Sequence, residues 1–452
     1  MKVKPTLSHV GIGVLLCLAG GCTGTPTAGE QEARDDLQRV HGAYRPGDAR
    51  SALPPLTASS PLDDYLRFAV LKNPRVEAAY YEWAASVERI TVARSLPDPR
   101  LTFQIDVSQM LSALMPGLMT DLPGPGKLAA AGAAAAQESR ASYFAFEQAI
   151  LRTAVAAKTA YYRLHFLEEN LRIQRATLAL LADLEQLARS QNAAGRVTLQ
   201  DVLRAQIEKE QVGTQIENLE DSRIALLAEW KAALGLGPGD ADPPIPAAFA
   251  SSPDAESADA LLQTALARNP ALRRMEAEVR AADAMLGLAE KSGVPDFTLG
   301  IEADVKANPL MLRPSAGMNL PVWRDKIAAE IAAAQADKRA VEARLDSEQI
   351  AVAADLAAML FMYRESRREI ELQSRRLIPL ARQSLDAARP AYATGRAGFL
   401  DVLDAQRQLL MFESALIDAR TRRELTLVAI SLIIVGIPPE GAPVLAPAES
   451  RP

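Results

Sequence analysis

Residues 188–206 read ARSQNAAGRVTLQDVLRAQ, and residues 388–406 read ARPAYATGRAGFLDVLDAQ. The two stretches align without a gap and share Gly195 and Gly395, the arginine after each, and an Asp-Val-Leu triplet. Shorter matches precede them at a similar spacing, with an Asn-Pro pair at 73 and 269, a Pro-Asp pair at 97 and 295, and a Leu-Pro pair at 122 and 320. A period of roughly 200 residues is far longer than the 20 to 50 of a solenoid unit. We therefore expect two copies of one large module.

The composition favours long helices over rounded cores. Aromatic residues make up only 5% of the 452, whereas Ala, Leu, Arg, Glu and Gln dominate long stretches. A net charge of -6, with acids and bases interspersed, argues against nucleic acid as a partner. Both cysteines lie within the first 22 residues, so the mature chain can form no internal disulfide and no multi-cysteine metal site.

The N-terminus has the layout of a bacterial lipoprotein signal. Lys2 and Lys4 precede an apolar run over residues 10–19, and Cys22 follows a small-residue segment. We predict a signal peptide over 1–21 and lipidation of Cys22, with ordinary signal cleavage as the alternative. Thr23, where an aspartate would retain the chain at the inner membrane, favours the outer membrane. Residues 22–57, rich in Gly, Pro and Thr, predict a flexible tether.

Each module shows the same order of patterns. The modules span 58–236 and 258–438, joined by a Pro- and Gly-rich linker at 237–257 and followed by a tail at 439–452. In each, an entry helix with a break at its Asn-Pro pair leads to two strands, a very long helix, the Gly turn and a returning helix. Strict alternation over 101–107 and 297–305 predicts strands with one apolar and one charged face. The second strands are predicted at 117–122 and 315–322.

Helix lengths predict a rod. About 65 residues from 126 to 190 lack proline and would extend close to 100 Å at 1.5 Å per residue. The counterpart from 325 to 389 should kink at Pro379. The entry and returning helices, stacked end to end, match this length. The pair of strands and the Gly turn should therefore lie at opposite ends of the rod.

Four strands with one apolar face cannot stand alone in lipid. An open sheet leaves unpaired edges, and small membrane barrels begin at about eight strands. Several copies must therefore share one barrel, with the helices arranged around the same axis as a tube.

At this point the chain resembles the TolC family of outer membrane efflux proteins, in its lipoprotein branch, over roughly residues 60 to 438. The paired Asn-Pro, Pro-Asp and Gly-Arg...Asp-Val-Leu...Ala-Gln elements carry the resemblance, and 122–128, LPGPGKL, is similar to a segment of heavy-metal efflux members. The family implies a mainly α fold with a membrane β-barrel portion, in which a homotrimer shares 12 strands above a periplasmic helical tunnel. It implies a channel, not an enzyme, without a cofactor. Its partners would be a periplasmic adaptor and an inner-membrane pump of the resistance-nodulation-division type.

The resemblance also implies where the tunnel closes. The family's acidic gate lies near the inter-helix turns, which corresponds to Asp401 and Asp404 in the second module. The first module keeps Asp201 but has Arg204 in place of the second acid, which points to the second copy as the gate. The alternative is that these aspartates only occupy helix starts, where negative charge is favoured.

Further residues have weaker functional interpretations. Gly195 and Gly395 are expected to make left-handed turns, and with Arg196 and Arg396 to form part of the surface that contacts the adaptor. His165 stands alone in a long helix and predicts no zinc site. The competing hypothesis is a coiled-coil adaptor or structural lipoprotein without a pore. The transported substrate, whether metal ion, drug or other small molecule, stays open.

Overall fold

The computed structural model of the chain describes residues 26–434 except 45–46, 48–52, 108–110, 248, 256 and 308. Cys22, the predicted signal peptide and the tail at 439–452 lie outside the described residues. The chain divides into two compact units. The first unit holds residues up to 38, 84–140 and 277–341, and the second holds 39–83, 141–276 and 342 onward. Each unit therefore takes segments from both sequence repeats.

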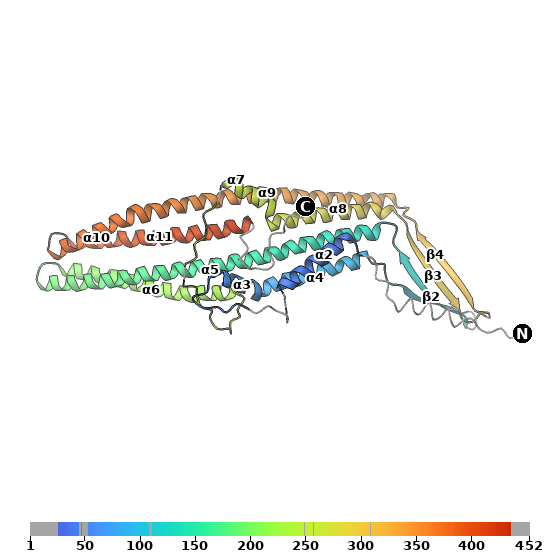
Figure 1. Cartoon of the computed structure of the whole chain (residues 1–452), viewed down its shortest axis with the longest axis horizontal. Helices are drawn as coiled ribbons and strands as arrows, with labels where there is room; N and C mark the ends of the chain where they lie inside the picture. The colour runs from blue at the N-terminus through green and yellow to red at the C-terminus, as the bar shows by residue number, and fades with distance from the viewer. Residues whose placement is uncertain are drawn as a thin grey trace. The chain divides into compact units, whose positions relative to one another are not determined.

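The two repeats have the same order of elements (Figure 1). The first consists of α3 (Leu62–Lys72), α4 (Pro74–Arg94), β1 (Arg100–Val107), β2 (Leu111–Leu122), α5 (Lys127–Ala193) and α6 (Leu199–Ala233). The second consists of α7 (Ala258–Arg268), α8 (Pro270–Glu290), the 3-10 turn η2 (Lys291–Gly293), β3 (Asp296–Asp304), β4 (Met311–Asn319), α9 (Arg324–Leu372), the π-helical η3 (Gln373–Leu377), α10 (Ile378–Ala393) and α11 (Phe399–Ile433). In the described part of the chain, no helix combines the length and apolarity that crossing a bilayer requires.

The long helix of the second repeat is interrupted where its proline lies. Pro379 has no N–H to donate, so the carbonyl of Arg375 loses its partner four residues on. The backbone N–H of Ile378 bonds instead to the carbonyl of Gln373, five residues back, which defines the π-helical turn η3. The disturbance predicted at Pro379 is thus present, whereas α5, without proline, is continuous.

The N-terminal segment differs from its prediction. Residues 28–44, expected to be part of a flexible tether, form helix α2 (Ala28–Tyr44). Gly- and Pro-rich composition around it hid a helical stretch whose Glu30, Val40 and Tyr44 are buried. Gly29 lies close to Ala136, within the small-residue run at the start of α5, where a larger side chain would not fit. The stability of this helix therefore comes from its tertiary packing and not from its intrinsic helix propensity.

The first unit contains a four-stranded antiparallel sheet in the order β1-β2-β3-β4 (Figure 1). Strand β2 begins six residues before its predicted start, because residues 111–116 pair with β1 despite Pro116. The pairing places most of the large apolar side chains of the four strands on one face, which Thr120 shares, namely Leu101, Phe103, Leu118, Phe297, Leu299, Ile301, Leu312 and Met318. The other face carries Thr102, Gln104, Met115, Met119, Asp121, Thr298, Glu302, Asp304, Arg313 and Ser315. The apolar face is exposed in the single chain.

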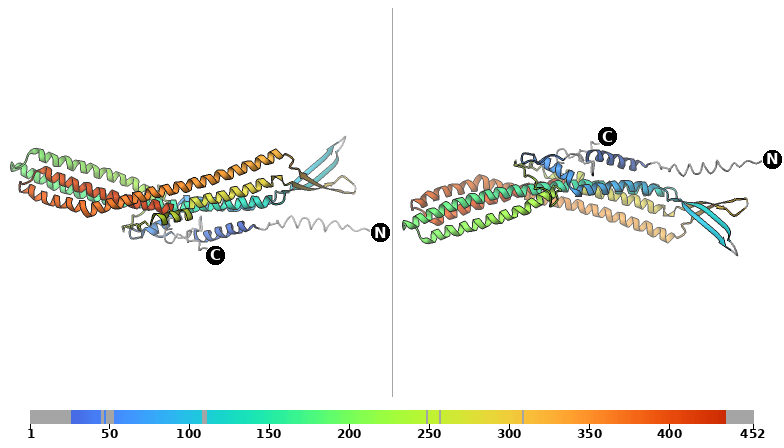
Figure 2. Two further views of the ribbon diagram at one scale, coloured as in Figure 1. Left: turned by 90° about the horizontal axis from the view of Figure 1, so that it is seen from above. Right: turned by 90° about the horizontal axis from the view of Figure 1, so that it is seen from below.

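In the second unit, each long helix lies beside the helix that returns along it, α6 on α5 and α11 on α10 (Figure 2). Their shared core includes Leu171, Leu181, Val202, Leu385 and Leu403, each at most 6% exposed. Leu167 of α5 belongs to the same interior.

The repeated Asn-Pro pairs join three helix ends in the second unit. The Asn269 side chain accepts the N–H of Ala271 at 2.8 Å, which caps α8, and donates to the carbonyl of Ile433 at 2.8 Å, near the end of α11. Asn73 does the same, accepting from Arg75 at 3.0 Å and donating to Ala233 at 3.4 Å. The proline occupies the first helical position, where no N–H is needed. Each Asn-Pro pair therefore connects an entry helix to the end of a returning helix by hydrogen bonds.

We expect Asn269→Ala to destabilise the protein by about 1–2 kcal/mol, because it removes a helix cap and leaves the partly buried carbonyl of Ile433 without this donor. Thermal unfolding of the purified protein would measure this. Asn192→Ala, which removes a hydrogen bond to the Val197 carbonyl from a half-buried side chain but no helix-end junction, is the comparison. Equal effects of the two substitutions would contradict the role given to the junction.

Candidate functional site

The two repeated turns have the same left-handed geometry. Gly195 and Gly395 have φ of 70° and 73°. In each turn the arginine after the glycine donates its backbone N–H to the carbonyl five residues back, Arg196 to Gln191 at 2.9 Å and Arg396 to Ala391 at 2.8 Å. This is the Schellman arrangement, which closes a helix C-terminus and requires a residue without a Cβ penalty. The recurrence of the Gly-Arg pair therefore has a backbone cause.

The two turns contact each other within the second unit. The Gln191 side chain donates to the carbonyl of Ala393 at 3.1 Å. Farther along the helices, Arg407 of α11 forms an ion pair with Glu208 of α6, whose carboxylate is 12% exposed. Between these contacts Tyr392 packs edge-on against Phe399, and both side chains are buried. The ends of the two helical hairpins are thus linked by a polar contact and an ion pair, and Tyr392 and Phe399 of the second hairpin belong to the buried core that the two hairpins share.

The three candidate gate aspartates have different surroundings. Asp401 accepts the backbone N–H of Gly398 at 2.8 Å, so its carboxylate caps α11. Asp201 lies 3.8 Å from Arg204 and 3.4 Å from the Thr198 hydroxyl, at the start of α6. Asp404 is exposed, one turn further into α11, near Arg407. The substitution of Arg204 for a second acid in the first repeat therefore neutralises charge, whereas the second repeat presents two carboxylates.

The two turn arginines are both exposed, and one of them has a side-chain partner. Arg396 donates from Nε to the Thr394 hydroxyl at 3.0 Å, whereas Arg196 is exposed and makes no side-chain hydrogen bond among the described residues.

Glu185, in the part of α5 that precedes the first turn, has a buried carboxylate that was not predicted from the sequence. Glu185 is 7% exposed and accepts from Arg189 at 2.6 Å, Gln206 at 3.0 Å and Lys209 at 3.0 Å. The bond from Arg189, followed by those from Lys209 and Gln206, lowers its pKa from 4.5 to about 2. Gln206 belongs to the repeated motif, so its role is to bind α6 to α5. The sequence did offer one signal for this site. Glu185 follows Leu181 by four residues, about one helical turn, so the two side chains lie on the same side of α5.

The pKa of Glu185 predicts a pH dependence of stability. A carboxyl with a depressed folded pKa stabilises the protein fully above its unfolded pKa, near 4.5, and this contribution is lost as pH falls toward 2. We expect Glu185→Gln to lower the melting temperature at pH 7, with the difference from wild type unchanged to pH 5 and shrinking between pH 4.5 and 2.5. Glu210→Gln, at an exposed site on α6, should show neither effect; a difference that stays constant to pH 2.5 would contradict the assignment.

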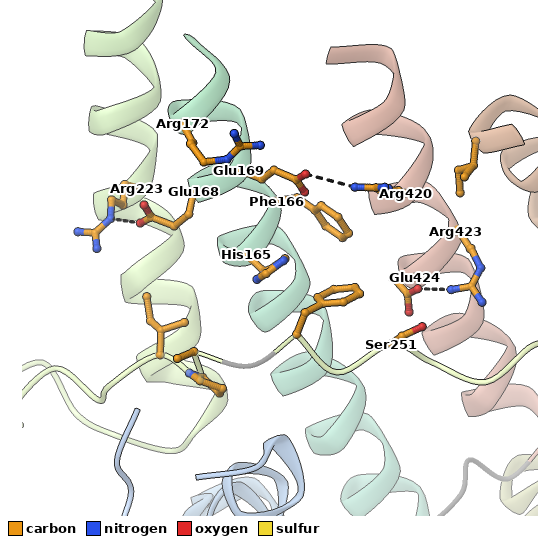
Figure 3. A pocket seen from close by; sticks show the side chains of 15 residues that line it. His165, Phe166, Glu168, Glu169, Arg172, Arg223, Ser251, Arg420, Arg423 and Glu424 are labelled. Carbon is orange, nitrogen blue, oxygen red and sulfur yellow. Dashed lines mark hydrogen bonds and ion pairs between the residues drawn. The ribbon is translucent and has the colours of Figure 1, made fainter. Parts of the chain in front are cut away.

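The inter-repeat linker lies over α5 and α11 and forms one wall of a cavity of about 930 Å³ (Figure 3). His165 stacks on Phe249 with ring centroids 4.5 Å apart, and burial lowers the pKa of the imidazole. Arg223 pairs with Glu168 on one side of α5, and Arg420 pairs with Glu169 on the other (Figure 3). His165 is therefore part of a packed aromatic wall.

Buried polar groups hold the linker in place. Tyr162 donates to the carbonyl of Ala250 at 2.7 Å, and Glu424, 2% exposed, accepts the N–H of Ser252 at 3.0 Å. Arg423 binds both Glu424 and Asp254. The sequence reading missed these residues, because each lies far along the chain from the linker it holds.

The LPGPGKL segment has a structural role at the sheet. Lys127 forms an ion pair of 2.8 Å with Asp296, the Asp of the second Pro-Asp pair, and Gly124 donates its N–H to the same carboxylate at 2.7 Å. A Cβ at Gly124 would lie 2.5 Å from the carbonyl oxygen of Pro295, and Gly126 has φ of 85°. This segment therefore joins the β-hairpin of the first repeat to that of the second. Among the described residues, no group of three or more His, Cys, Asp or Glu side chains is placed to hold a metal ion.

Comparisons with known proteins agree with this architecture. Residues 261–434 match the model of the outer membrane efflux protein family. The cobalt-zinc-cadmium resistance protein CzcC of Cupriavidus metallidurans is 26% identical over 372 residues, covering 80% of this chain and 85% of that protein. Both the family model and CzcC are thus similar to this chain over its helical and strand-bearing parts.

Two solved structures of outer membrane proteins share the fold of this chain. VceC of Vibrio cholerae superposes with a TM-score of 0.71 at 19% identity, over 83% of this chain and 96% of that one. CmeC of Campylobacter jejuni superposes with a TM-score of 0.72 at 13% identity, over 88% and 91%. Each superposition covers more than 80% of this chain, so its four-stranded sheet and long helices have the fold of these two structures.

Proposed function

We propose that three copies of this chain form the exit duct of a tripartite efflux system. The three sheets close into one 12-stranded barrel in the outer membrane, and the helices continue it as a periplasmic tunnel. A periplasmic adaptor joins the tunnel to an inner-membrane pump of the resistance-nodulation-division type. A lipid on Cys22 adds a second attachment to the membrane. The gate and the adaptor-contact surface lie at the inter-helix turns.

The sheet carries this proposal. One face is apolar across all four strands, the other is polar, and β1 and β4 are edge strands. In lipid, every backbone N–H and carbonyl needs a partner, so an open edge is not tolerated. A coiled-coil adaptor or structural lipoprotein without a pore has no use for such a surface.

The internal repeat supplies the pairing between copies. The Pro-Asp pairs and the Leu-Pro pairs of the two repeats are both 198 residues apart. Within the chain, β2 pairs with β3 so that Gly117 faces Glu302 and Thr120 faces Leu299. The same relation, shifted by one repeat, pairs β4 of one copy with β1 of the next, with Ser315 opposite Gln104 and Met318 opposite Leu101. This register puts polar beside polar and apolar beside apolar, which a shift of one residue would reverse.

Cysteine pairs test the closed barrel. In a chain with Ser315→Cys and Gln104→Cys, mild oxidation should link three copies covalently, because directly opposed strand residues satisfy disulfide geometry. Thr102→Cys with Ser315→Cys, on the same face but two residues out of register, is the matched control and should not cross-link. Single-channel conductance of the reconstituted trimer measures the pore. A water-soluble monomer without conductance would overturn the proposal.

The proposed cargo is heavy-metal cations. The support is the name of the similar protein from C. metallidurans, a cobalt-zinc-cadmium resistance protein, and the exposed carboxylates at the second turn. Expression of this chain with its own pump and adaptor should restore growth of a sensitive strain on Co²⁺, Zn²⁺ or Cd²⁺. Restored growth on drugs without any on metals would assign the duct to another substrate.

Of the candidate aspartates, Asp404 is the best placed to act as the gate carboxylate. Three copies bring three exposed Asp404 side chains to the narrow end of the tunnel, where a ring of like charges favours cations. Asp401 contributes charge as well, but its carboxylate is also bound to the Gly398 backbone.

A further inference from the structure

The cavity beneath the inter-repeat linker is built by residues of the second unit alone. Its volume of about 930 Å³ is within the range of pockets that hold drug-sized ligands. The linker contributes Ile245, Phe249 and Ser251, and Ile370 comes from the end of α9. Helices α5, α6 and α11 contribute the charged part of the lining. The cavity is therefore large enough for a small organic molecule and has both apolar and charged walls.

The apolar wall is aromatic. Phe249 of the linker stacks on His165, and its ring centroid lies 5.7 Å from that of Phe166 in an edge-on contact. Phe166 is 4% exposed, whereas Phe249 is 43% exposed. A large aromatic ring that lines a cavity and keeps much of its surface open can pack against a second flat ring.

The charged side chains of the lining pair with one another, with one exception. Three arginines of the lining each form an ion pair with a glutamate of the lining, namely Arg223 with Glu168, Arg420 with Glu169, and Arg423 with Glu424. The fourth arginine, Arg172, is exposed, and its side chain forms no hydrogen bond or ion pair among the described residues. Burial lowers the pKa of His165, so its imidazole is neutral at pH 7. The lining therefore has one positive charge without a partner.

The helix period places this charge and the aromatic wall on the same side of α5. Residues 165, 168, 169 and 172 are spaced as i, i+3, i+4 and i+7, so they form a row on one face of the helix. Arg172 lies at one end of this row and His165 at the other (Figure 3). The two positions are about 10 Å apart along the helix axis. The long side chain of Arg172 and a two-ring molecule can span that distance together.

We propose that this cavity binds an aromatic acid with a single negative charge, whose carboxylate pairs with Arg172 and whose rings lie against Phe249. A guanidinium binds a carboxylate through two parallel charge-assisted hydrogen bonds. The partial enclosure of the cavity strengthens this pairing relative to bulk water. One carboxylate is enough, because the other charges of the lining already have partners. The site is separate from the gate and from the barrel of the proposed function.

Two probes with the same rings separate the effect of charge from that of apolar contact. Naphthoate has a carboxylate, and naphthalenemethanol has a neutral hydroxyl group at the equivalent position. Isothermal titration calorimetry of the purified full-length protein should show that naphthoate binds about tenfold more tightly than the alcohol. Naphthoate should also raise the melting temperature of the protein, because it binds the folded state. No binding of naphthoate, or equal affinities for the two probes, would overturn the proposal.

Matched variants locate the site. Arg172→Gln should weaken naphthoate binding about tenfold and leave binding of the alcohol unchanged, because only the charge-assisted hydrogen bonds are lost. Arg175→Gln is the control, since Arg175 is also an exposed arginine of α5 but pairs with Glu220 and does not line the cavity. Phe249→Leu should weaken binding of both probes to a similar extent.

Equal weakening of naphthoate binding by Arg172→Gln and Arg175→Gln would mean that net charge alone attracts the probe, and would overturn the assignment. None of these measurements depends on a pore. A chain that binds naphthoate as expected but forms no conducting trimer would therefore contradict the proposed function and leave this site established.

Discussion

Replacement of Asp404 by alanine is expected to weaken block of the channel by multivalent cations about tenfold and to raise its conductance. The carboxylate is exposed next to the second turn, and three copies would surround a narrow mouth, where the field of like charges is focused. Single-channel recording with a trivalent cation on the periplasmic side would measure both quantities. The double variant Asp401→Ala with Asp404→Ala should show the larger change.

The effects of the two aspartates should be distinguishable by a second measurement, the stability of each single variant. Asp401→Ala removes the acceptor of the Gly398 N–H and should cost about 1 kcal/mol of stability, whereas Asp404→Ala should cost almost none. Asp418→Ala, also an exposed acid of α11 but far from the turn, controls for net charge. If conductance and block are unchanged in the double variant, the gate assignment is wrong and both residues only occupy a helix start.

Gly235→Ala is expected to destabilise the protein by at least about 2 kcal/mol and to lower the melting temperature of the trimer. Gly235 has φ of 74°, a region that costs an L-residue about 1–2 kcal/mol. An added Cβ would also lie 2.7 Å from the Cα and 2.9 Å from the N of Asn73, which are backbone atoms that cannot move aside. The substitution therefore disrupts the packing at the junction where the end of α6 contacts α3 and α4.

The comparison for Gly235 lies four residues away. Gly239 has no atom near the position of an added Cβ, and its backbone is not left-handed. Gly239→Ala should leave the melting temperature of the trimer within about 1 °C of wild type, whereas Gly235→Ala should lower it by several degrees. Similar melting temperatures for the two variants would show that the junction can relax around a side chain.

The repeats, the strands and the long helices could be predicted because each rests on local periodicity. Alternation over 101–107 and the break at Asn73-Pro74 are present in the structure as predicted. Helix α2 could not be predicted, since its stability depends on Glu30 meeting Arg94, 64 residues away. The start of β2 was misplaced for the same reason, because residues 111–116 are held in a strand by their pairing with β1.

The candidate gate shows the same division. The sequence marked Asp201, Asp401 and Asp404 through the repeat, but could not tell a cap from a free carboxylate. That distinction depends on whether the backbone N–H of Gly398 lies within reach, which is a matter of turn geometry. Likewise Glu185, Glu424 and Lys127 gain their roles only from partners brought together by folding.

By itself the sequence determined that this protein is a duplicated module of strands and very long helices, because helix and strand periods and the turn glycines act over a few residues. Only the tertiary structure decided which charged groups are buried and paired, where α2 docks, and how the hairpins of the two repeats join into one sheet. Those outcomes depend on contacts between residues far apart in the chain, whose electrostatic and packing energies exist only once the helices and strands have come together.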